Sequence, residues 1–180
     1  MLLLLQARQL SWTVASIESA KRQQKINHKT KDMNIEQKLQ QLEDRITIRE
    51  LIDQYAFCAD TRDAQGQMAI FTEDTNFVVY MDEKLPEPTQ VVKGRKNLFP
   101  VFDDLNQYFS TMHLNGQSTI KVNENRATAT TYCRAYHLKV QDEVQKLMIA
   151  GIRYYDTVIK QNDKWLFAER KLKVCWIENR

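Results

Sequence analysis

The segment after Ser110 most constrains the fold, because it reads as strands up to the last few residues. β-Branched and aromatic residues alternate with polar ones, and only short turns rich in Asn, Asp and Glu interrupt the alternation. The predicted strands are residues 111–122, 126–140, 147–160 and 165–176. Long strands that are joined by tight turns pair antiparallel. The sequence therefore predicts a sheet with four consecutive antiparallel strands.

The segment between residues 34 and 110 predicts the helices that cover this sheet. From Ile35 to Ala59, apolar residues recur mostly every three or four positions, which is the pattern of a long amphipathic helix. Asp63 is a suitable N-cap for a second helix, and Gly94 precedes a third. The further predicted elements are a helix at residues 63–71, a strand at 75–81 and a helix at 96–108. Helices followed by a run of strands indicate an α+β fold, with the helices on one face of a curved sheet.

The length of 180 residues favours one domain. We place this domain at residues 34–180 and expect residues 1–33 to be an N-terminal extension, either disordered or partly helical. Residues 1–32 hold six basic and two acidic residues, which leaves 20 basic and 21 acidic residues in the rest of the chain. A nearly neutral domain without a basic stripe argues against nucleic acid as a partner.

Neither the start of the chain nor its cysteines indicate export or a membrane location. Residues 1–5 are apolar, but they lack a charged start and a convincing cleavage site. No run of about 18 apolar residues occurs, so we expect no membrane partner. The three cysteines lack metal-ligand spacing and cannot all pair with one another, which fits a reducing compartment. We therefore expect a cytoplasmic protein.

Two histidines are the strongest candidates for chemistry. His113 lies on a strand face of polar residues, and His137 lies on a strand face of small residues. Asp60 lies near the end of the long helix, five positions after Tyr55. A carboxylate, two imidazoles and a phenol can form a proton-transfer set, because imidazole titrates near neutral pH and a carboxylate can orient it. The alternatives are a solvated His113 and ordinary packing around His137.

Strict alternation assigns other polar residues to the two faces of the sheet. In the strand at residues 111–122, Asn115 shares the polar face with His113, opposite Leu114. Asn115 is therefore a candidate substrate contact. In the third long strand, Arg153 is either a guanidinium oriented toward substrate or an ion-pair partner on the outer face.

The order of elements and several short motifs resemble the SnoaL-like branch of the nuclear transport factor 2-like superfamily, over residues 35–177. The motifs are Y-x4-D-x2-D at residues 55–63, F-T-E-D at 71–74, I-R-Y-Y-D at 152–156 and K-W-L-F at 164–167. The resemblance implies a cystatin-like α+β barrel. In that fold a curved antiparallel sheet wraps around a helix hairpin and a third helix to make a cone, whose open end holds a mostly apolar pocket.

Within this branch the chain is most similar to the scytalone dehydratase and bile-acid dehydratase types. The first resemblance implies that Asp60, His137 and His113 are catalytic and that Asp60 hydrogen-bonds His137. It also implies that Tyr80 matches a tyrosine that polarises the substrate carbonyl. We expect Asn115 to join Tyr80 among the substrate-binding residues.

The chain departs from both types. Scytalone dehydratases carry another carbonyl-binding tyrosine where this chain has Ala59. Tyr55 is expected to substitute for it, because bile-acid dehydratases resemble this chain in placing a tyrosine five residues before the aspartate. Those enzymes, however, use an acidic residue near the position of His137. The mixture leaves the substrate open, and Arg153 completes the set of expected substrate contacts.

These expectations favour a cofactor-independent lyase or isomerase of the dehydratase type. It would act on a small, largely apolar cyclic carbonyl compound by His/Asp acid–base catalysis, with neither a metal nor another cofactor. The alternatives are a non-catalytic SnoaL-like protein that binds a ligand or assembles with partners, and the small subunit of a ring-hydroxylating dioxygenase. The resemblance also implies a homodimer or homotrimer.

Overall fold

The computed structural model describes residues 34–180, so the extension predicted at residues 1–33 lies outside the described residues. Among the described residues, a boundary between two units falls after Leu42. Helix α2 (Ile35–Thr61) begins in the first unit and continues in the second. Its first turn is closed by a reciprocal capping box, in which Gln37 N–H donates to Asn34 Oδ1 at 2.8 Å and Asn34 N–H donates to Gln37 Oε1 at 3.1 Å.

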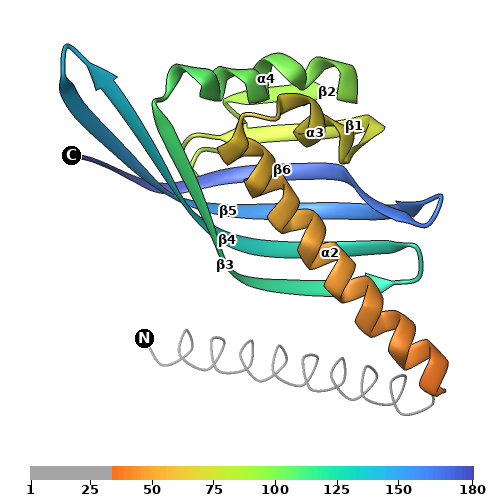
Figure 1. Cartoon of the computed structure of the whole chain (residues 1–180). Coiled ribbons are helices and arrows are strands. Elements are labelled where there is room, and N and C mark those ends of the chain that lie inside the picture. Colours follow the sequence, from red (N-terminus) through yellow and green to blue (C-terminus); the bar gives the residue numbers. More distant parts are fainter. Residues whose placement is uncertain (1–33) are drawn as a thin grey trace, which may run out of the picture. The chain divides into compact units, whose positions relative to one another are not determined.

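The second unit, residues 43–180, contains one curved six-stranded sheet (Figure 1). Its strands are β1 (Phe71–Tyr80), β2 (Gln90–Lys93), β3 (Ser110–Asn123), β4 (Arg126–Gln141), β5 (Val144–Gln161) and β6 (Lys164–Asn179). The order across the sheet is β2-β1-β6-β5-β4-β3. The four predicted antiparallel strands are confirmed as β3 to β6.

The sheet is mixed rather than wholly antiparallel, because β1 pairs parallel with β6. The chain leaves β1, forms the edge strand β2 and then crosses to the far edge of the sheet, where β3 begins. Four antiparallel strands return it to β1, so that β6 arrives in the same direction as β1. This parallel pair is the point at which the expected antiparallel sheet needs correction.

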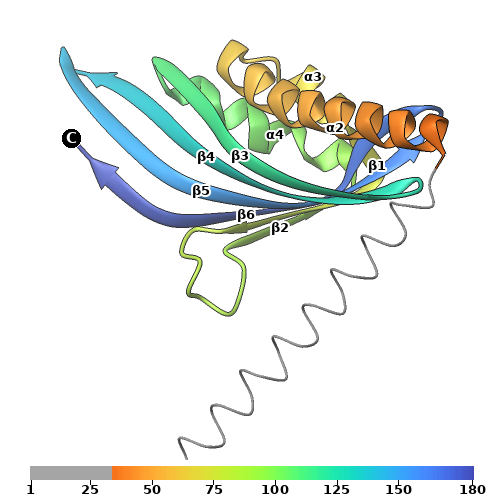
Figure 2. The same ribbon diagram turned by 90° about the horizontal axis from the view of Figure 1, so that it is seen from below.

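The helices of this unit lie on the concave face of the sheet, as Figure 2 shows. Asp63 is confirmed as the N-cap of α3 (Ala64–Ala69), because its carboxylate accepts a hydrogen bond from Gly66 N–H at 2.7 Å. Phe71 opens β1 instead of closing this helix. The expected helix at residues 96–108 is three short pieces, η1 (Arg95–Asn97), α4 (Phe99–Asp103) and η2 (Asp104–Gln107). Short 3₁₀ pieces of this kind connect elements without extending a helix.

Two tight turns join β4 to β5 and β5 to β6, and the register of the sheet shifts at several places. Residues 142 and 143, and likewise residues 162 and 163, all have positive φ, as type I′ hairpin turns require. The register shifts between Asn115 and Ser118 in β3, and at two places along β5 and β6. In β3 the shift reverses which residues face inward, so Ser118 is partly buried whereas Gln117 is exposed.

The core of the second unit lies between α2 and the concave face. The small residues of β4 face inward as predicted, and Ala127, Ala129, Cys133 and Ala135 are all buried. Aromatic rings fill the space that these small side chains leave, with Tyr55 in edge contact with Phe71, Phe102, Tyr154 and Phe167. The predicted apolar stripe of α2 shifts along the helix, since Ile46 is exposed and burial of the stripe begins at Ile48.

Within residues 34–180, no helix is both long enough and apolar enough to cross a membrane.

Candidate functional site

A carboxylate–imidazole pair lies where the last turn of α2 meets β3. Asp60 Oδ1 is 2.7 Å from His113 Nδ1, and Asp60 Oδ2 accepts a hydrogen bond from His113 N–H at 2.8 Å. The Thr111 hydroxyl donates to Asp60 Oδ1 at 3.0 Å. Asp60 therefore binds His113, and the hydrogen bond expected between Asp60 and His137 is not formed.

The strand register explains why Asp60 binds His113 rather than His137. Thr111 lies opposite His137 in the β3–β4 pair, and His113 lies opposite Ala135, so the two histidines are offset by two residues. The end of α2 faces the edge strand β3, so Asp60 reaches His113 on that strand rather than His137 on β4. The ring of His137 is still close, with its centroid 5.4 Å from that of His113 and the two planes at 87°.

Asp60 is held as a carboxylate. Burial alone would raise its pKa, but the hydrogen bonds from the side chain and backbone of His113 outweigh burial and bring the pKa below its usual value. A carboxylate only accepts hydrogen bonds, so Nδ1 of His113 carries a proton, and Nε2 is the ring nitrogen left for proton exchange. The pair thus presents a basic nitrogen that the carboxylate orients.

His137 differs from His113 in lacking a charged partner. It is 8% exposed, and its Nδ1 is buried with no hydrogen-bond partner among the described residues. Burial and the neighbouring His113 lower the pKa of His137 to about 4. At neutral pH it is therefore an uncharged imidazole. Its ring packs against Tyr108, with centroids 4.8 Å apart.

Arg62 supports the carboxylate through Thr111. One of its guanidinium nitrogens donates to the Thr111 hydroxyl at 2.6 Å and to Ala59 O at 2.8 Å. Because the hydroxyl oxygen already accepts from Arg62, its hydrogen is left for Asp60. Arg62 itself has a φ of 62°, a left-handed conformation that is uncommon for a residue other than glycine.

Three residues of this site, Arg62, Thr111 and Tyr108, were not predicted as functional. Thr111 did have a signal, because alternation placed it on the same face as His113. Arg62 and Tyr108 had none, since one follows the end of α2 and the other follows η2. Their positions depend on how these element ends meet in space.

A cavity of about 380 Å³ adjoins the site and is open beside His137. Its lining comes from the ends of β4, β5 and β6 and from the loop before β3, through Tyr108, His137, Lys139, Lys146, Leu147, Met148, Asn179 and Arg180. Aromatic and aliphatic side chains make up one part of this lining, and cationic side chains make up another.

Tyr55 lies in the core and not at this cavity. It is 6% exposed, and burial raises its pKa to about 12. The guanidinium of Arg170 lies 4.0 Å from the centroid of the Tyr55 ring. Arg170 in turn forms a bidentate ion pair with Asp156, with both N–O distances at 2.8 Å. The structure therefore groups Tyr55 with a buried ion pair.

The other three expected substrate contacts are also occupied elsewhere. Tyr80 alternates with the buried Val79, and its ring lies against the Lys173 ammonium at 4.5 Å. Arg153 pairs with Glu83 at 3.1 Å, as its outer-face interpretation predicted. Tyr80 and Arg153 thus do not converge with His113.

Asn115 joins β3 to α2. Its amide nitrogen donates to Ile52 O at 3.2 Å and to Asp53 Oδ1 at 3.0 Å. These bonds fix the helix on the strand only a few residues from His113. Its position favours a structural contact over a contact with substrate.

Among the described residues, no group of three or more His, Cys, Asp or Glu side chains is arranged to hold a metal ion. The three cysteines are free, and Cys58 and Cys133 are buried. Burial raises the pKa of Cys133 to about 11, so that thiol stays protonated at neutral pH.

Comparisons with known proteins agree with this fold. A family model described as a SnoaL-like domain matches residues 40–171. No functionally curated protein matches the chain. Among solved structures, a protein of Novosphingobium aromaticivorans DSM 12444, provisionally named a scytalone dehydratase, is 21% identical with a TM-score of 0.66. That alignment covers 77% of this chain and 88% of the other.

Two further structures are similar. Hexachlorocyclohexane dehydrochlorinase LinA-type3 from Novosphingobium barchaimii LL02 is 14% identical with a TM-score of 0.66, over 79% of this chain and 94% of the other. A nuclear transport factor 2-like protein with a cystatin-like fold from Novosphingobium aromaticivorans is 24% identical with a TM-score of 0.60, over 78% and 88%. At these identities the likeness establishes the fold, which confirms the predicted α+β class.

Proposed function

This chain belongs to the SnoaL-like family, and we propose that it is a cofactor-independent lyase of the dehydratase type. The observation that carries the proposal is the Asp60–His113 pair, in which a carboxylate orients an imidazole whose second nitrogen is free. An oriented base of this kind, close to a cavity, is what proton abstraction next to a carbonyl requires.

The chemistry follows from the geometry of the pair. Nε2 of His113 takes a proton from the carbon next to a carbonyl, and the C–H electrons form an enolate. The imidazolium that results is stabilised by Asp60, which stays ionised because its pKa is low. Collapse of the enolate expels a hydroxyl group from the β-carbon, and the imidazolium protonates it. A double bond and water are the products, and His113 ends as it began.

His137 and Tyr108 act on the substrate side of this pair. A neutral His137 can donate a hydrogen bond to the developing enolate oxygen without competing for the proton that His113 removes. Tyr108, which packs on His137, is expected to cover the ring of a bound substrate. Leu147 and Met148 supply further apolar surface. The proposed substrate is therefore a small, largely apolar cyclic carbonyl compound with a β-hydroxyl group.

Asp60→Asn tests the proposal. The assay is loss of water from 3-hydroxy-1-tetralone, a cyclic β-hydroxy ketone whose dehydration gives 1-naphthol and a change in ultraviolet absorbance. We expect kcat/KM to fall by about 10²–10⁴-fold, the usual contribution of acid–base catalysis, because an amide cannot stabilise the imidazolium. The matched control is Asp74→Asn, an exposed aspartate on β1.

A folded Asp60→Asn protein with full activity would remove Asp60 from the mechanism. The wild-type protein could also bind the tetralone, seen as a rise in Tm, without releasing 1-naphthol above the uncatalysed rate. That result would favour the alternative of a ligand-binding protein with the same fold. The expected homodimer or homotrimer, the cytoplasmic location and the extension at residues 1–33 also remain proposals, of which gel filtration tests the first.

A further inference from the structure

Two lysines face each other across the end of the β4–β5 hairpin. Lys139 on β4 and Lys146 on β5 are direct partners in the antiparallel register. Lys139 is two residues beyond His137 and therefore points to the same face of the sheet. Lys146 is two residues before Met148, and both line the same cavity as His137. In Figure 2 this hairpin curls toward the side of the sheet that carries the helices.

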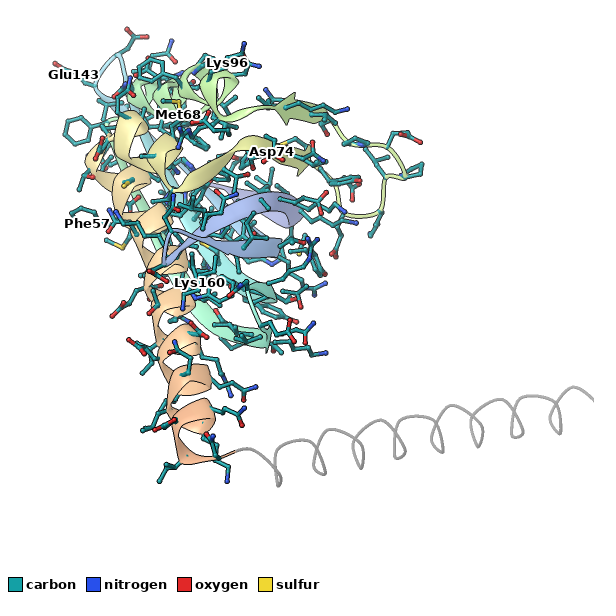
Figure 3. The ribbon with its side chains drawn as sticks, turned by 90° about the vertical axis from the view of Figure 1, so that its right-hand side faces the viewer. Phe57, Met68, Asp74, Lys96, Glu143 and Lys160 are labelled. Carbon is teal, nitrogen blue, oxygen red and sulfur yellow. The ribbon has the colours of Figure 1, made fainter. Side chains whose placement is uncertain are left out.

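The two ammonium groups repel each other, and an anion between them would relieve that repulsion. Like charges directly opposite each other in an antiparallel pair are destabilising. Within residues 34–180, neither Lys139 nor Lys146 has an ion-pair partner. Acidic residues of the hairpin lie in its turn, where Figure 3 places Glu143 at the tip. One carboxylate of the neighbouring strand, that of Glu178, is bound to Arg180 at 2.7 Å.

The cavity connects this lysine pair to His137, one of the two proposed catalytic histidines. Tyr108 and His137 line one part of it, and Lys139 and Lys146 line another. Two residues along a strand span about 7 Å, which is close to the width of a bicyclic ring system. A ligand whose reacting carbon lies beside His137 can therefore place a substituent on the opposite side of its ring near both ammonium groups.

We propose that this cavity selects a cyclic carbonyl compound that also carries a carboxylate, with the carboxylate bound between Lys139 and Lys146. The inference rests on the proposed function for the position of the reacting carbon, while the lysine pair and the cavity are independent of it. The lysines orient the substrate and raise its local concentration, because opposite charges steer association. They take no part in proton transfer. Both side chains are exposed, so the attraction is screened by salt.

Binding of a matched pair of probes tests the proposal. One probe is 1-tetralone-6-carboxylate, and the other is the neutral 6-carboxamide of the same ring system. Isothermal titration calorimetry at 50 mM NaCl is expected to give a Kd at least about tenfold lower for the carboxylate, which corresponds to one modest charge interaction. In 500 mM NaCl this preference should shrink, and Lys139→Gln/Lys146→Gln should abolish it.

Two control double variants test whether the preference depends on the position and on the charge of the two lysines. Lys121→Gln/Lys164→Gln removes the same charge from the opposite end of the sheet and should keep the preference. Lys139→Arg/Lys146→Arg keeps the charge and should also keep it. Equal affinity for both probes, no binding of the carboxylate, or a preference that survives in the glutamine variant would each overturn the proposal.

The measurement is independent of turnover. Asp60→Asn should bind the carboxylate with the wild-type preference, because Asp60 lies outside the lining of the cavity. If the preference is present but no dehydration occurs with any β-hydroxy ketone, then the ligand class stands and the dehydratase proposal fails. If dehydration occurs without a preference for the carboxylate probe, then the dehydratase proposal stands and the proposed ligand class fails.

Discussion

Two carboxylates of the second unit, Asp156 and Asp60, have nitrogen-bearing partners whose surroundings differ completely. The side chains of Arg170 and Asp156 are 0% exposed and are joined by two hydrogen bonds, and the guanidinium lies within 4.4 Å of the centroids of three aromatic rings. Asp60 and His113 are joined at the end of α2, where the side chain of Asp60 is 26% exposed. The first pair is closed to solvent, and the second leaves one imidazole nitrogen unused.

The difference separates a structural ion pair from a reactive one. A guanidinium cannot lose its proton at any physiological pH, so Arg170 and Asp156 can hold the core together but cannot transfer protons. An imidazole can change its protonation state near neutral pH. In this chain, the Arg170–Asp156 pair fixes the aromatic packing around Tyr55, and the Asp60–His113 pair orients an imidazole base. The predictions below separate these two uses, beginning with the largest expected effect.

Removing one member of the core pair is expected to cost the most. Arg170→Met leaves Asp156 buried without a partner, and breaking a buried pair in this way typically costs about 3–5 kcal/mol of the free energy of unfolding. Urea denaturation followed by circular dichroism measures the loss. The double variant Asp156→Asn/Arg170→Met removes the buried charge and should recover part of the stability.

The matching change in the reactive pair should be much milder. The free energy of unfolding of Asp60→Asn is expected to lie within about 1 kcal/mol of the wild-type value, because the Asp60 side chain is partly exposed and pairs with access to solvent contribute little to stability. An Arg170→Met protein as stable as the wild type, or an Asp60→Asn protein that is as unstable as Arg170→Met, would erase the distinction between the two pairs.

The second prediction concerns pH and involves His137. Its pKa in the folded protein is about 4, below the unfolded value of 6.5, so the unfolded chain binds more protons between these values. Stability is therefore present above pH 6.5 and is lost as the pH falls toward 4, by about 3 kcal/mol at most. Tm measured from pH 4 to pH 8 should show this loss.

His137→Asn provides the control for that titration. The variant should lose most of the slope between pH 6.5 and pH 4, because an amide does not titrate. Arg170 contributes no slope in this range, since its guanidinium keeps its charge throughout. An unchanged slope in His137→Asn would assign the titration to another group and weaken the contrast between the two regions.

The sequence predicted the fold and most of the inner face of the sheet. Small residues at every second position of β4 and the order of the elements carried that information, and Ala129 and Ala135 are buried as expected. For Arg153 the sequence left two interpretations open, and its ion pair with Glu83 agrees with the outer-face one. Alternation is a local property of the chain, which is why the inward-facing residues could be predicted from the sequence alone.

The hydrogen-bond partner of Asp60 could not be predicted from alternation along the strands. His113 and His137 both lie on inward faces, and the choice between them depends on where the end of α2 crosses the sheet. The register shift after Asn115 also reversed the expected face of the second half of β3. Gly116 next to that shift was the one local hint of a bulge. Contacts between element ends are set by the tertiary structure rather than by periodicity.

The smallest predicted effect concerns Arg62, which we regard as a positioning residue for Asp60. Arg62→Ala should allow the Thr111 hydroxyl to rotate away, so that Asp60 loses one of the hydrogen bonds that lower its pKa. We expect kcat to fall by about fivefold, consistent with the loss of one hydrogen bond of about 1 kcal/mol, with little change in KM. The acid limb of the pH–rate profile should also move to higher pH.

A double-mutant cycle with Thr111→Val separates this role from a purely structural one. If Arg62 acts through the Thr111 hydroxyl, Arg62→Ala should add almost nothing to Thr111→Val, because both remove the same hydrogen bond from Asp60. Arg62→Lys can still donate to Thr111 and should recover part of kcat. If Arg62 only closes the end of α2 through Ala59 O, the two effects will instead be additive, stability will fall, and the pH profile will not move.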